Sequence, residues 1–544
     1  MRVRHSKAVV VLLMFGLLTA ACGGGGQTGG GTAVDGGEFS VAIHEPQSPL
    51  IPSDTDEAEG AKVLKALFTG LVVYDTETSE PVNAMAESIT SPDQRVWTIK
   101  IKDGWTFHDG TPVTARSYVN GWNFGAYGPN AQDGANFYSN ISGYDDLQCG
   151  NGADGKVDCS ASPPKAKEMS GLQVLDDTTF QVTLSEPFSQ FPVTLGYHPF
   201  LPVPDALARD PKAYGDQPVG NGPFMMDGPW QHNRSIRMKR FPGYAGEPAK
   251  AGAVEFRIYT SDQTAYNDLV GGQLDILDEI PIDKIAVAEQ DLDGRYLERP
   301  RSDFTYIGFP LYRPEFQNPK LRIAFSKAID RAEIAEKIFG GARTPAFGYV
   351  SPLVIGARPN ACGDNCAYDP AAAKRLFDEA GGFDGQLELW FNSGASHDKW
   401  MEAVANQLSR NLGLEPPVFK QFDFAEYLSF LDGKQSTGPY RLGWIMDYPS
   451  PQNYLEPIFS TTGSSNQFGY SNPEVDQLIA QGNAASSIDQ GVTLYHRAED
   501  QILKDMPAIP LFYGRVNAGY SERVDNVAVN ARSEYEVANV TVVR

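Results

Sequence analysis

The chain has 544 residues and a mass of 59.3 kDa, which is too long for one ordinary domain of about 100–200 residues, so we expect two or three lobes. Apolar residues make up 41% of the chain, and glycine and proline stay below the share typical of disordered proteins, so most of the chain should fold. The formal net charge of −23 argues against a nucleic-acid-binding protein, which needs basic residues to contact phosphates, and against a protein that binds membrane surfaces through basic residues.

The first residues have the pattern of an export signal. Three basic residues, at positions 2, 4 and 7, precede an apolar run at 8–18, and small residues follow it. This order predicts a signal peptide at residues 1–21. The run is shorter than the roughly 20 residues that a membrane-spanning helix needs, and no later stretch of the sequence approaches that length. We therefore expect an exported protein.

Residues 18–22 resemble a bacterial lipobox, the motif that directs lipid attachment to a cysteine. Cys22 would then be acylated and become the first mature residue. The sequence departs from the motif at Thr19, where leucine is usual, and the alternative is an ordinary secretory cleavage in which Cys22 plays no part. Residues 22–37 are rich in glycine and predict a flexible tether. This N-terminus predicts a protein held outside the cytoplasm by a lipid anchor in the bacterial cell membrane.

The rest of the sequence predicts a mixture of helices and strands without internal repeats. The spacing of apolar residues predicts, in chain order, a helix at 58–67, a strand at 96–102, a surface loop at 149–167, a strand at 179–184, helices at 319–339 and 370–380, a strand at 387–391, and helices at 399–412, 473–484 and 490–504. Several of these helices begin with Asp-Pro or Asn-Pro, which suits proline at the first helical position. The alternation of strands and helices predicts the α/β class.

Four cysteines follow Cys22, at positions 149, 159, 362 and 366. An even number in an oxidising compartment suggests disulfides. Three pairings are possible, and the pairs closest in sequence, Cys149 with Cys159 and Cys362 with Cys366, would each close a local loop. A zinc site built from all four thiolates is the alternative, although the two spacings do not match those of paired zinc knuckles.

The sequence lacks the usual signatures of catalysis. It contains no G-x-S-x-G elbow, no H-E-x-x-H motif, no Walker loop and no G-x-G-x-x-G after a predicted strand. The segment His108-Asp109-Gly110 is typical of a turn. We expect a protein that is not an enzyme, with no catalytic residue, no metal site and no cofactor.

One long motif resembles the signature of a known family. Residues 97–122, WTIKIKDGWTFHDGTPVTARSYVNGW, are similar to the signature segment of family 5 solute-binding proteins of ABC importers, the oligopeptide- and dipeptide-binding group. Further matches follow in the family's order, at residues 67–75, 218–224, 318–331, 368–370 and 470–476. The resemblance therefore covers nearly the whole mature chain.

The resemblance implies a bilobal fold of the periplasmic-binding-protein type, type II, with an extra third lobe. It places a discontinuous lobe I at 38–68, 200–304 and 514–544, lobe II at 69–199 and lobe III at 305–513. It implies a monomeric receptor that binds a peptide ligand between two lobes and delivers it to the transmembrane permease subunits of an ABC importer. Fold alone does not fix the ligand, so two alternatives stay open. One is a receptor of the same fold for a non-peptide ligand, such as a metal chelate, haem or a sugar. The other is a sensing lipoprotein without transport.

The most informative segment for ligand binding is residues 441–449, RLGWIMDYP. In an extended strand, Arg441, Gly443, Ile445 and Asp447 share one face, and glycine lets another backbone approach closely. The segment resembles the family's Gly-Trp-x-x-Asp strand, which implies that Asp447 binds the α-ammonium group of the peptide. It also implies that the backbone of Gly443, Trp444 and Ile445 pairs with the peptide. The alternative for Asp447 is a turn aspartate that caps local amides.

Four further residues fall at positions that contact ligand in relatives. Arg441 and His397 would meet the carboxylate at the far end of the peptide, with a solvated arginine and a histidine at a helix start as the alternatives. Tyr138 and Phe424 fall near aromatic contacts of relatives, although buried core aromatics are the interpretation we favour for both.

Overall fold

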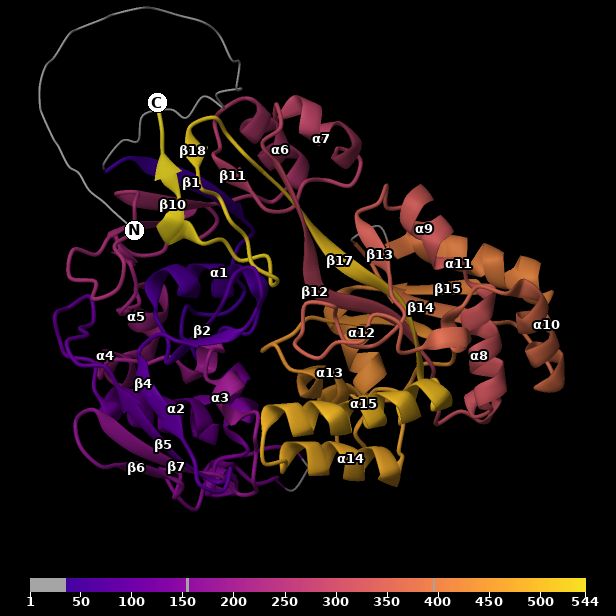
Figure 1. The fold of residues 1–544 in the computed structure, drawn as a ribbon, viewed down its shortest axis with the longest axis horizontal. Helices are drawn as coiled ribbons and strands as arrows, with labels where there is room; N and C mark the ends of the chain where they lie inside the picture. The colour runs from indigo at the N-terminus through magenta and orange to yellow at the C-terminus, as the bar shows by residue number, and fades with distance from the viewer. Residues whose placement is uncertain (1–35, 153–155, 395–396) are drawn as a thin grey trace, which may run out of the picture.

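The computed structural model describes residues 36–152, 156–394 and 397–544 (Figure 1). The predicted signal peptide, Cys22 and most of the predicted tether lie outside these residues. An eleven-stranded sheet organises the fold. Its strands lie in the order β15 (Val418–Phe422), β14 (Glu388–Asn392), β16 (Tyr440–Trp444), β12 (Tyr296–Gly308), β17 (Ala508–Tyr520), β11 (Ile276–Leu277), β1 (Glu38–Ile43), β10 (Ala253–Ile258), β9 (Ser235–Arg240) and β8 (Phe224–Met226), and β13 (Arg343–Pro345) also pairs with β17.

Two long strands, β12 and β17, connect the two ends of this sheet and run side by side across the molecule (Figure 1). They pair in antiparallel fashion at both of their ends, but their register shifts between Pro300 and Phe304. Irregular pairing of this kind bends and twists a strand locally. The irregular stretch therefore interrupts the regular pairing of β12 with β17 between the two ends of the sheet.

A separate four-stranded sheet lies at the lower left of Figure 1, in the order β4 (Ala86–Thr90), β5 (Val96–Ile101), β7 (Thr179–Thr183) and β6 (Leu172–Val174). Its alternating exposure along β5 and β7 matches the predicted half-buried strands. Helix α2 (Ala115–Ala126) packs against it through buried residues that include Tyr118 and Trp122. Two small ribbons complete the strands: β2 (Val72–Tyr74) with β3 (Pro81–Asn83), and β18 (Val524–Asp525) with β19 (Thr541–Val542).

Buried apolar side chains form separate cores. One cluster lies within residues 71–200, around the four-stranded sheet. A second joins side chains of residues 39–68 to others at 201–276 and 516–542, and the largest contains side chains of 304–513 together with Ala531. The chain thus leaves one core and returns to it, which is why its C-terminal strands lie beside β1 and β10 in Figure 1.

The remaining helices cover these sheets. They are α1 (Ala58–Leu67), α3 (Phe191–Thr194), α4 (Ala206–Arg209), α5 (Pro211–Asp216), α6 (Asp262–Val270), α7 (Ile285–Asp291), α8 (Pro319–Ala328), α9 (Arg331–Lys337), α10 (Pro370–Glu379), α11 (His397–Leu412), α12 (Phe424–Asp432), α13 (Pro451–Phe459), α14 (Pro473–Asn483) and α15 (Ile488–Asp505). The predicted Asx-Pro starts are confirmed at α8, α10 and α14, where Asn318, Asp369 and Asn472 accept a hydrogen bond from a backbone N–H of the first turn. Such caps satisfy the free N–H groups of the first turn.

One predicted helix is wrong: residues 319–339 form two helices, α8 and α9, rather than one. The chain becomes extended at Ile329, and the side chain of Asp330 accepts a hydrogen bond of 3.0 Å from the backbone N–H of Glu333. A new N-cap therefore interrupts a run whose apolar spacing alone is continuous, because aspartate favours a cap over a helix interior.

Both predicted disulfides are confirmed, Cys149–Cys159 and Cys362–Cys366. The zinc alternative is therefore wrong, since all four sulfurs are bonded in pairs. The first disulfide lies in the predicted surface loop, where the described residues from Cys149 to Lys167 contain no helix or named strand.

Removal of the Cys149–Cys159 disulfide should destabilise the fold modestly. The bond closes a loop with a sequence separation of 10, and a loop of this size restricts the unfolded chain by about 2–3 kcal/mol. We expect the Cys149→Ser/Cys159→Ser double variant to lose about that much free energy of unfolding, as measured by denaturant unfolding followed by tryptophan fluorescence. An unfolding curve that coincides with that of the unsubstituted protein would contradict a stabilising role.

Candidate functional site

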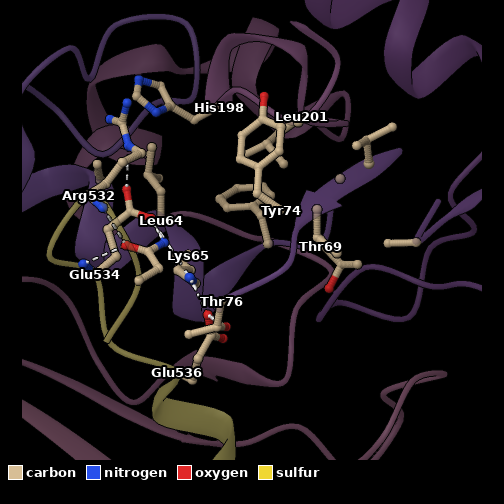
Figure 2. Close-up of a pocket in the computed structure, with 18 of the residues that line it drawn as sticks. Leu64, Lys65, Thr69, Tyr74, Thr76, His198, Leu201, Arg532, Glu534 and Glu536 are labelled. Atoms are coloured by element: carbon tan, nitrogen blue, oxygen red, sulfur yellow. Dashed lines mark hydrogen bonds and ion pairs between the residues drawn. The ribbon is translucent and has the colours of Figure 1, made fainter. Parts of the chain in front are cut away.

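Two cavities meet at a single side chain, that of Asp447. The larger, about 470 Å³, lies between helix α1, the β2–β3 ribbon and the C-terminal segment 530–538. Figure 2 shows it with Arg532 and Glu534 on one side and Thr69 on the other. The smaller, about 280 Å³, lies between residues 136–200, around the four-stranded sheet, and residues 444–464. Asp447 lines both cavities, so its side chain lies where the two open spaces adjoin.

Asn453 fixes the position of Asp447. The side-chain oxygen of Asn453 accepts a hydrogen bond of 2.8 Å from the Asp447 backbone N–H, and its amide nitrogen donates one of 2.9 Å to the Asp447 carboxylate. Asn453 lies in the first turns of α13, directly after the strand that leads to Asp447. One side chain of α13 therefore holds both the backbone and the carboxylate of Asp447.

Among the residues that the structure describes, no basic side chain forms an ion pair with the carboxylate of Asp447. Burial raises its pKa, and the Asn453 amide, the charge of Arg532 and a hydrogen bond from Tyr197 oppose that rise. The Arg532 guanidinium instead donates to the carbonyl oxygens of Met446 and, at 3.4 Å, of Asp447. A buried carboxylate without an ion-pair partner is costly, and a positively charged group that entered either cavity would offset that cost.

Arg532 is anchored by a buried network that sequence reasoning missed. It forms an ion pair of 3.0 Å with Glu534, and its guanidinium lies 5.2 Å from the centre of the Tyr197 ring. Glu534 also accepts from Asn530, and Lys65 pairs with Glu536 at 2.6 Å (Figure 2). These contacts join α1, the 446–447 backbone and the C-terminal segment. The one signal in the sequence is the charge at every second position from 532 to 536, which places these charges on one face of an extended segment.

The strand that precedes Asp447 has a free edge. Strand β16 pairs with β12 over five residues, but with β14 only at Tyr440. The Pro439 carbonyl accepts from Trp390 of β14, and the Arg441 carbonyl accepts from the Tyr427 hydroxyl at 2.6 Å. Backbone groups of alternate residues face the same edge of a strand, so those of Gly443 face the side that β14 leaves open.

The predicted alternation along residues 441–447 agrees with the structure except at Trp444, which is only half-buried. Leu442 and Met446 are buried, whereas Arg441, Gly443, Ile445 and Asp447 keep partly exposed surface. A Cβ atom at Gly443 would lie 3.0 Å from the Phe304 carbonyl oxygen. The backbone that approaches Gly443 closely is thus that of β12. Trp444 donates from its indole nitrogen to Asn453 at 3.3 Å and lines the smaller cavity.

Arg441 and His397 lie together at the other end of β16, outside both cavities. Arg441 donates to the Asn392 side chain at 2.9 Å, its Nε is buried without a partner, and burial lowers its pKa to about 10. His397 accepts from the Trp400 indole at 3.1 Å, an assignment that fixes the tautomer. Burial, with Arg441 and Arg343 nearby, lowers the pKa of His397 to about 3. His397 is therefore neutral at pH 7, and Arg441 carries the positive charge.

Tyr138 and Phe424 lie apart from both cavities. Tyr138 is fully buried and donates from its hydroxyl to the Pro199 carbonyl, so the core interpretation is confirmed for it. A ligand cannot reach this ring in the described conformation. For Phe424 the core interpretation is wrong, because the side chain is 50% exposed at the start of α12. The ring lies on the surface at the first position of α12, and it lines neither of the two cavities.

The structure offers no arrangement that indicates metal chemistry. Within the described residues, no three His, Cys, Asp or Glu side chains are placed to hold a metal ion. His108 connects its turn to the neighbouring loop: its ring accepts a hydrogen bond from the Gly220 N–H and contacts the Gly222 carbonyl. Among the helices of the described part of the chain, none has both the length and the apolar character that crossing a membrane requires.

Comparisons with known proteins agree with this architecture. The model of the bacterial extracellular solute-binding proteins, family 5, matches residues 80–466. The periplasmic oligopeptide-binding protein OppA of Salmonella typhimurium is 29% identical over 484 residues, which is 85% of this chain and 84% of OppA. The glutathione-binding protein GsiB of Escherichia coli O1:K1 / APEC is 27% identical over 501 residues, 90% of this chain and 91% of GsiB.

Solved structures show the same fold. The murein tripeptide-binding protein MppA of Escherichia coli superposes with a TM-score of 0.77 at 22% identity, over 94% of this chain and 99% of MppA. OppA of Haemophilus influenzae, in complex with the peptide RPPGFSPFR, superposes with a TM-score of 0.74 at 21% identity, over 94% of this chain and all of that one. The fold is thus the bilobal type II fold of periplasmic binding proteins. The match of the family model to more than half of the sequence shows that this chain belongs to the bacterial extracellular solute-binding proteins of family 5.

Proposed function

We propose that this protein is a receptor for extended oligopeptides, which it holds between lobe I (38–68, 200–304 and 514–544) and lobe III (305–513), with lobe II (69–199) at one side. The observation that carries the proposal is the carboxylate of Asp447, which forms no ion pair among the described residues, after a strand whose second edge pairs with β14 only at Tyr440. An extended peptide can add to such an edge through its backbone, which gives affinity that depends little on its sequence. Its α-ammonium group would then pair with Asp447.

The length of β16 and its continuation suggests the length of peptide. Arg441 and Asp447 are six positions apart, which corresponds to roughly 20 Å in extended chain. A peptide of about five or six residues could therefore place its ammonium group at Asp447 and its carboxylate near Arg441. Since His397 is neutral at pH 7, Arg441 would supply the charge at that end. The backbone of Gly443 and Ile445 would pair with the peptide, while that of Trp444 faces β12.

Calorimetric titration tests this function. Unmodified peptides of about five or six residues should bind, and a sugar should not. Glutathione is included because GsiB is named for binding it, and because glutathione has a free α-ammonium but too short a backbone to reach Arg441. Tighter binding of peptides than of glutathione supports the proposal. Binding of glutathione alone, or of none of these ligands to a folded protein, would contradict it.

The relatives point to the role of the receptor. Homologues are substrate-binding receptors of ABC importers rather than enzymes, and OppA is named as periplasmic. We propose that this protein acts as a monomer outside the cytoplasm and passes its peptide to permease subunits in the membrane. Lipid on Cys22 would keep the receptor near them, because each buried methylene adds about 0.8 kcal/mol of membrane affinity and more than one acyl chain gives stable retention.

Substitution of Cys22 tests the anchor. Cys22→Ala should release the protein into the medium or leave an uncleaved precursor, as seen by fractionation and immunoblotting. The double variant Cys149→Ser/Cys159→Ser is the matched control, since it removes cysteines without touching the N-terminus. A fully cleaved Cys22→Ala protein that stays in the membrane fraction would contradict lipid anchoring.

A further inference from the structure

The smaller cavity beside Asp447 has the size of one side chain rather than of a whole ligand. Its volume is about 280 Å³, below the usual range of roughly 300–1,000 Å³ for complete small-molecule sites. Aromatic side chains line it from both sides: Phe188, Phe191 and Phe200 come from the region of the four-stranded sheet, and Trp444 comes from β16. Because Asp447 lines this cavity, a peptide whose ammonium group paired with Asp447 would have its first side chain within reach of the cavity.

A second carboxylate, that of Glu456, lines the same cavity. Within the part of the chain that the structure describes, no basic side chain pairs with it. Its Oε2 accepts from Gln452 and, at 2.9 Å, from Asn483. Its Oε1 has no hydrogen-bond partner among the described residues. One oxygen is therefore fixed by neighbours while the other is available to a ligand.

The neighbours of Glu456 hold it in place. The Tyr448 hydroxyl donates to Gln452 at 2.6 Å, and Gln452 donates in turn to Glu456. On the other side, the Tyr495 hydroxyl donates to Asn483 at 2.7 Å. The two walls of the cavity are also tied together, since Ser450 donates to Gln190 at 3.0 Å and the Ser189 N–H donates to the Asn483 carbonyl at 2.7 Å. The carboxylate is thus positioned before any ligand enters.

The lining of the cavity, with two carboxylates and several aromatic rings, suits a basic side chain. Asn453, which holds Asp447, and Glu456 are three positions apart on α13, so their Cβ atoms are about 5–6 Å apart on one helix face. Lysine and arginine carry their charge on a long apolar stem that packs well along aromatic surfaces, and their cations are attracted to aromatic faces. The strongly negative net charge of −23 would also favour the approach of cationic ligands.

We propose that the cavity is the subsite for the first side chain of the peptide, and that Glu456 selects lysine or arginine at that position. This inference rests on the proposed peptide-binding function. The ligand class is then a peptide with two positive charges at its N-terminal residue, one held by Asp447 and the other by Glu456.

Calorimetry with four pentapeptides tests the subsite. They share the sequence X-Ala-Ala-Ala-Ala, with X as lysine, arginine, norleucine or alanine; norleucine keeps the stem of lysine and removes its charge. The lysine and arginine peptides should bind about 10- to 100-fold more tightly than the norleucine peptide, as expected for a partly desolvated charge pair. In Glu456→Gln, which can keep the hydrogen bonds from Gln452 and Asn483, this preference should fall to within about threefold.

The controls separate the subsite from the function on which it rests. Glu474→Gln removes an exposed carboxylate from the same lobe and should keep the full preference. A wild-type protein that binds all four peptides equally would overturn the inference while leaving peptide binding intact. An equal loss of all four peptides in Glu456→Gln would overturn it as well, because that result indicates a structural role. If no peptide binds the wild type, the result contradicts both the proposed function and the inference.

Discussion

Replacement of Asp447 should weaken peptide binding by about 30-fold to a few thousand-fold. This range follows from a cost of about 2–5 kcal/mol for removing one partner of a desolvated charge pair, at about 1.4 kcal/mol for each factor of ten. Asp447→Asn is the sharper variant, because the new amide can keep contact with Asn453 while it removes the charge. Calorimetry with a free-amino peptide provides the measurement. An affinity within about threefold of the wild type would rule out Asp447 as the ammonium anchor.

Acetylation of the peptide N-terminus gives a second measurement of the same contact. It removes the positive charge from the other partner, so the losses caused by acetylation and by Asp447→Asn should not add. If the two losses add in full, the ammonium group and Asp447 do not interact.

The same substitution should not destabilise the ligand-free protein. Burial raises the pKa of Asp447 in the fold, so its ionised form is disfavoured by folding at neutral pH. Asp447→Asn removes that cost, and its melting temperature without ligand should equal or exceed that of the wild type. A lower melting temperature would indicate that the carboxylate stabilises the fold, and binding data for the variant would then need correction for stability.

Glu534→Ala should lower the free energy of unfolding by about 3–5 kcal/mol, the usual cost of leaving one member of a buried ion pair without its partner. Glu534 and Arg532 are both largely buried, and their side chains pair at 3.0 Å. The substitution leaves the Arg532 guanidinium without its carboxylate beside Tyr197 and the 446–447 backbone. Denaturant unfolding is the measurement, and Glu522→Ala, an exposed carboxylate near the C-terminus, should change stability little.

The pH dependence of stability should identify the same pair. Arg532 and Lys65 hold the pKa of Glu534 at about 2, below its ordinary value of 4.5. The lowered pKa means that the pair stabilises the fold fully above pH 4.5, and that this contribution is lost as the pH falls from 4.5 toward 2. Glu534→Ala should therefore lose less stability than the wild type over that interval. Equal losses in the two proteins would show that Glu534 does not carry this part of the acid sensitivity.

Much of the local structure could be predicted because its determinants are local. Asn and Asp before proline mark helix starts through caps that involve only the next three residues. The alternation along 441–447 correctly predicts the buried faces of Leu442 and Met446, since a strand has a period of two. The single helix predicted at 319–339 is wrong for a reason that is also local: the cap at Asp330 ends one helix and starts another within a continuous apolar pattern.

The site was only partly predictable because it is assembled from distant segments. A motif on one strand predicts Asp447 as a site residue. Its neighbours Tyr197 and Arg532 lie about 250 and 85 positions away along the chain. Their proximity depends on the order of strands in the sheet, which no periodicity in the sequence encodes. Glu456 was missed for a different reason. A lone glutamate in a helix is ordinary on a surface, and only the cavity makes it a candidate.

The identity of the natural ligand tests the proposed peptide binding most directly. The protein should be purified from its host without denaturation and then denatured, and the released small molecules identified by mass spectrometry. Protein carrying Asp447→Asn and purified in parallel controls for molecules that adhere elsewhere. We expect the wild type to release peptides with free N-termini, enriched in lysine or arginine at the first position, and the variant to release far fewer of them. Release of a metal chelate, a haem or a sugar, or of the same peptides in equal amounts from both proteins, would contradict this expectation.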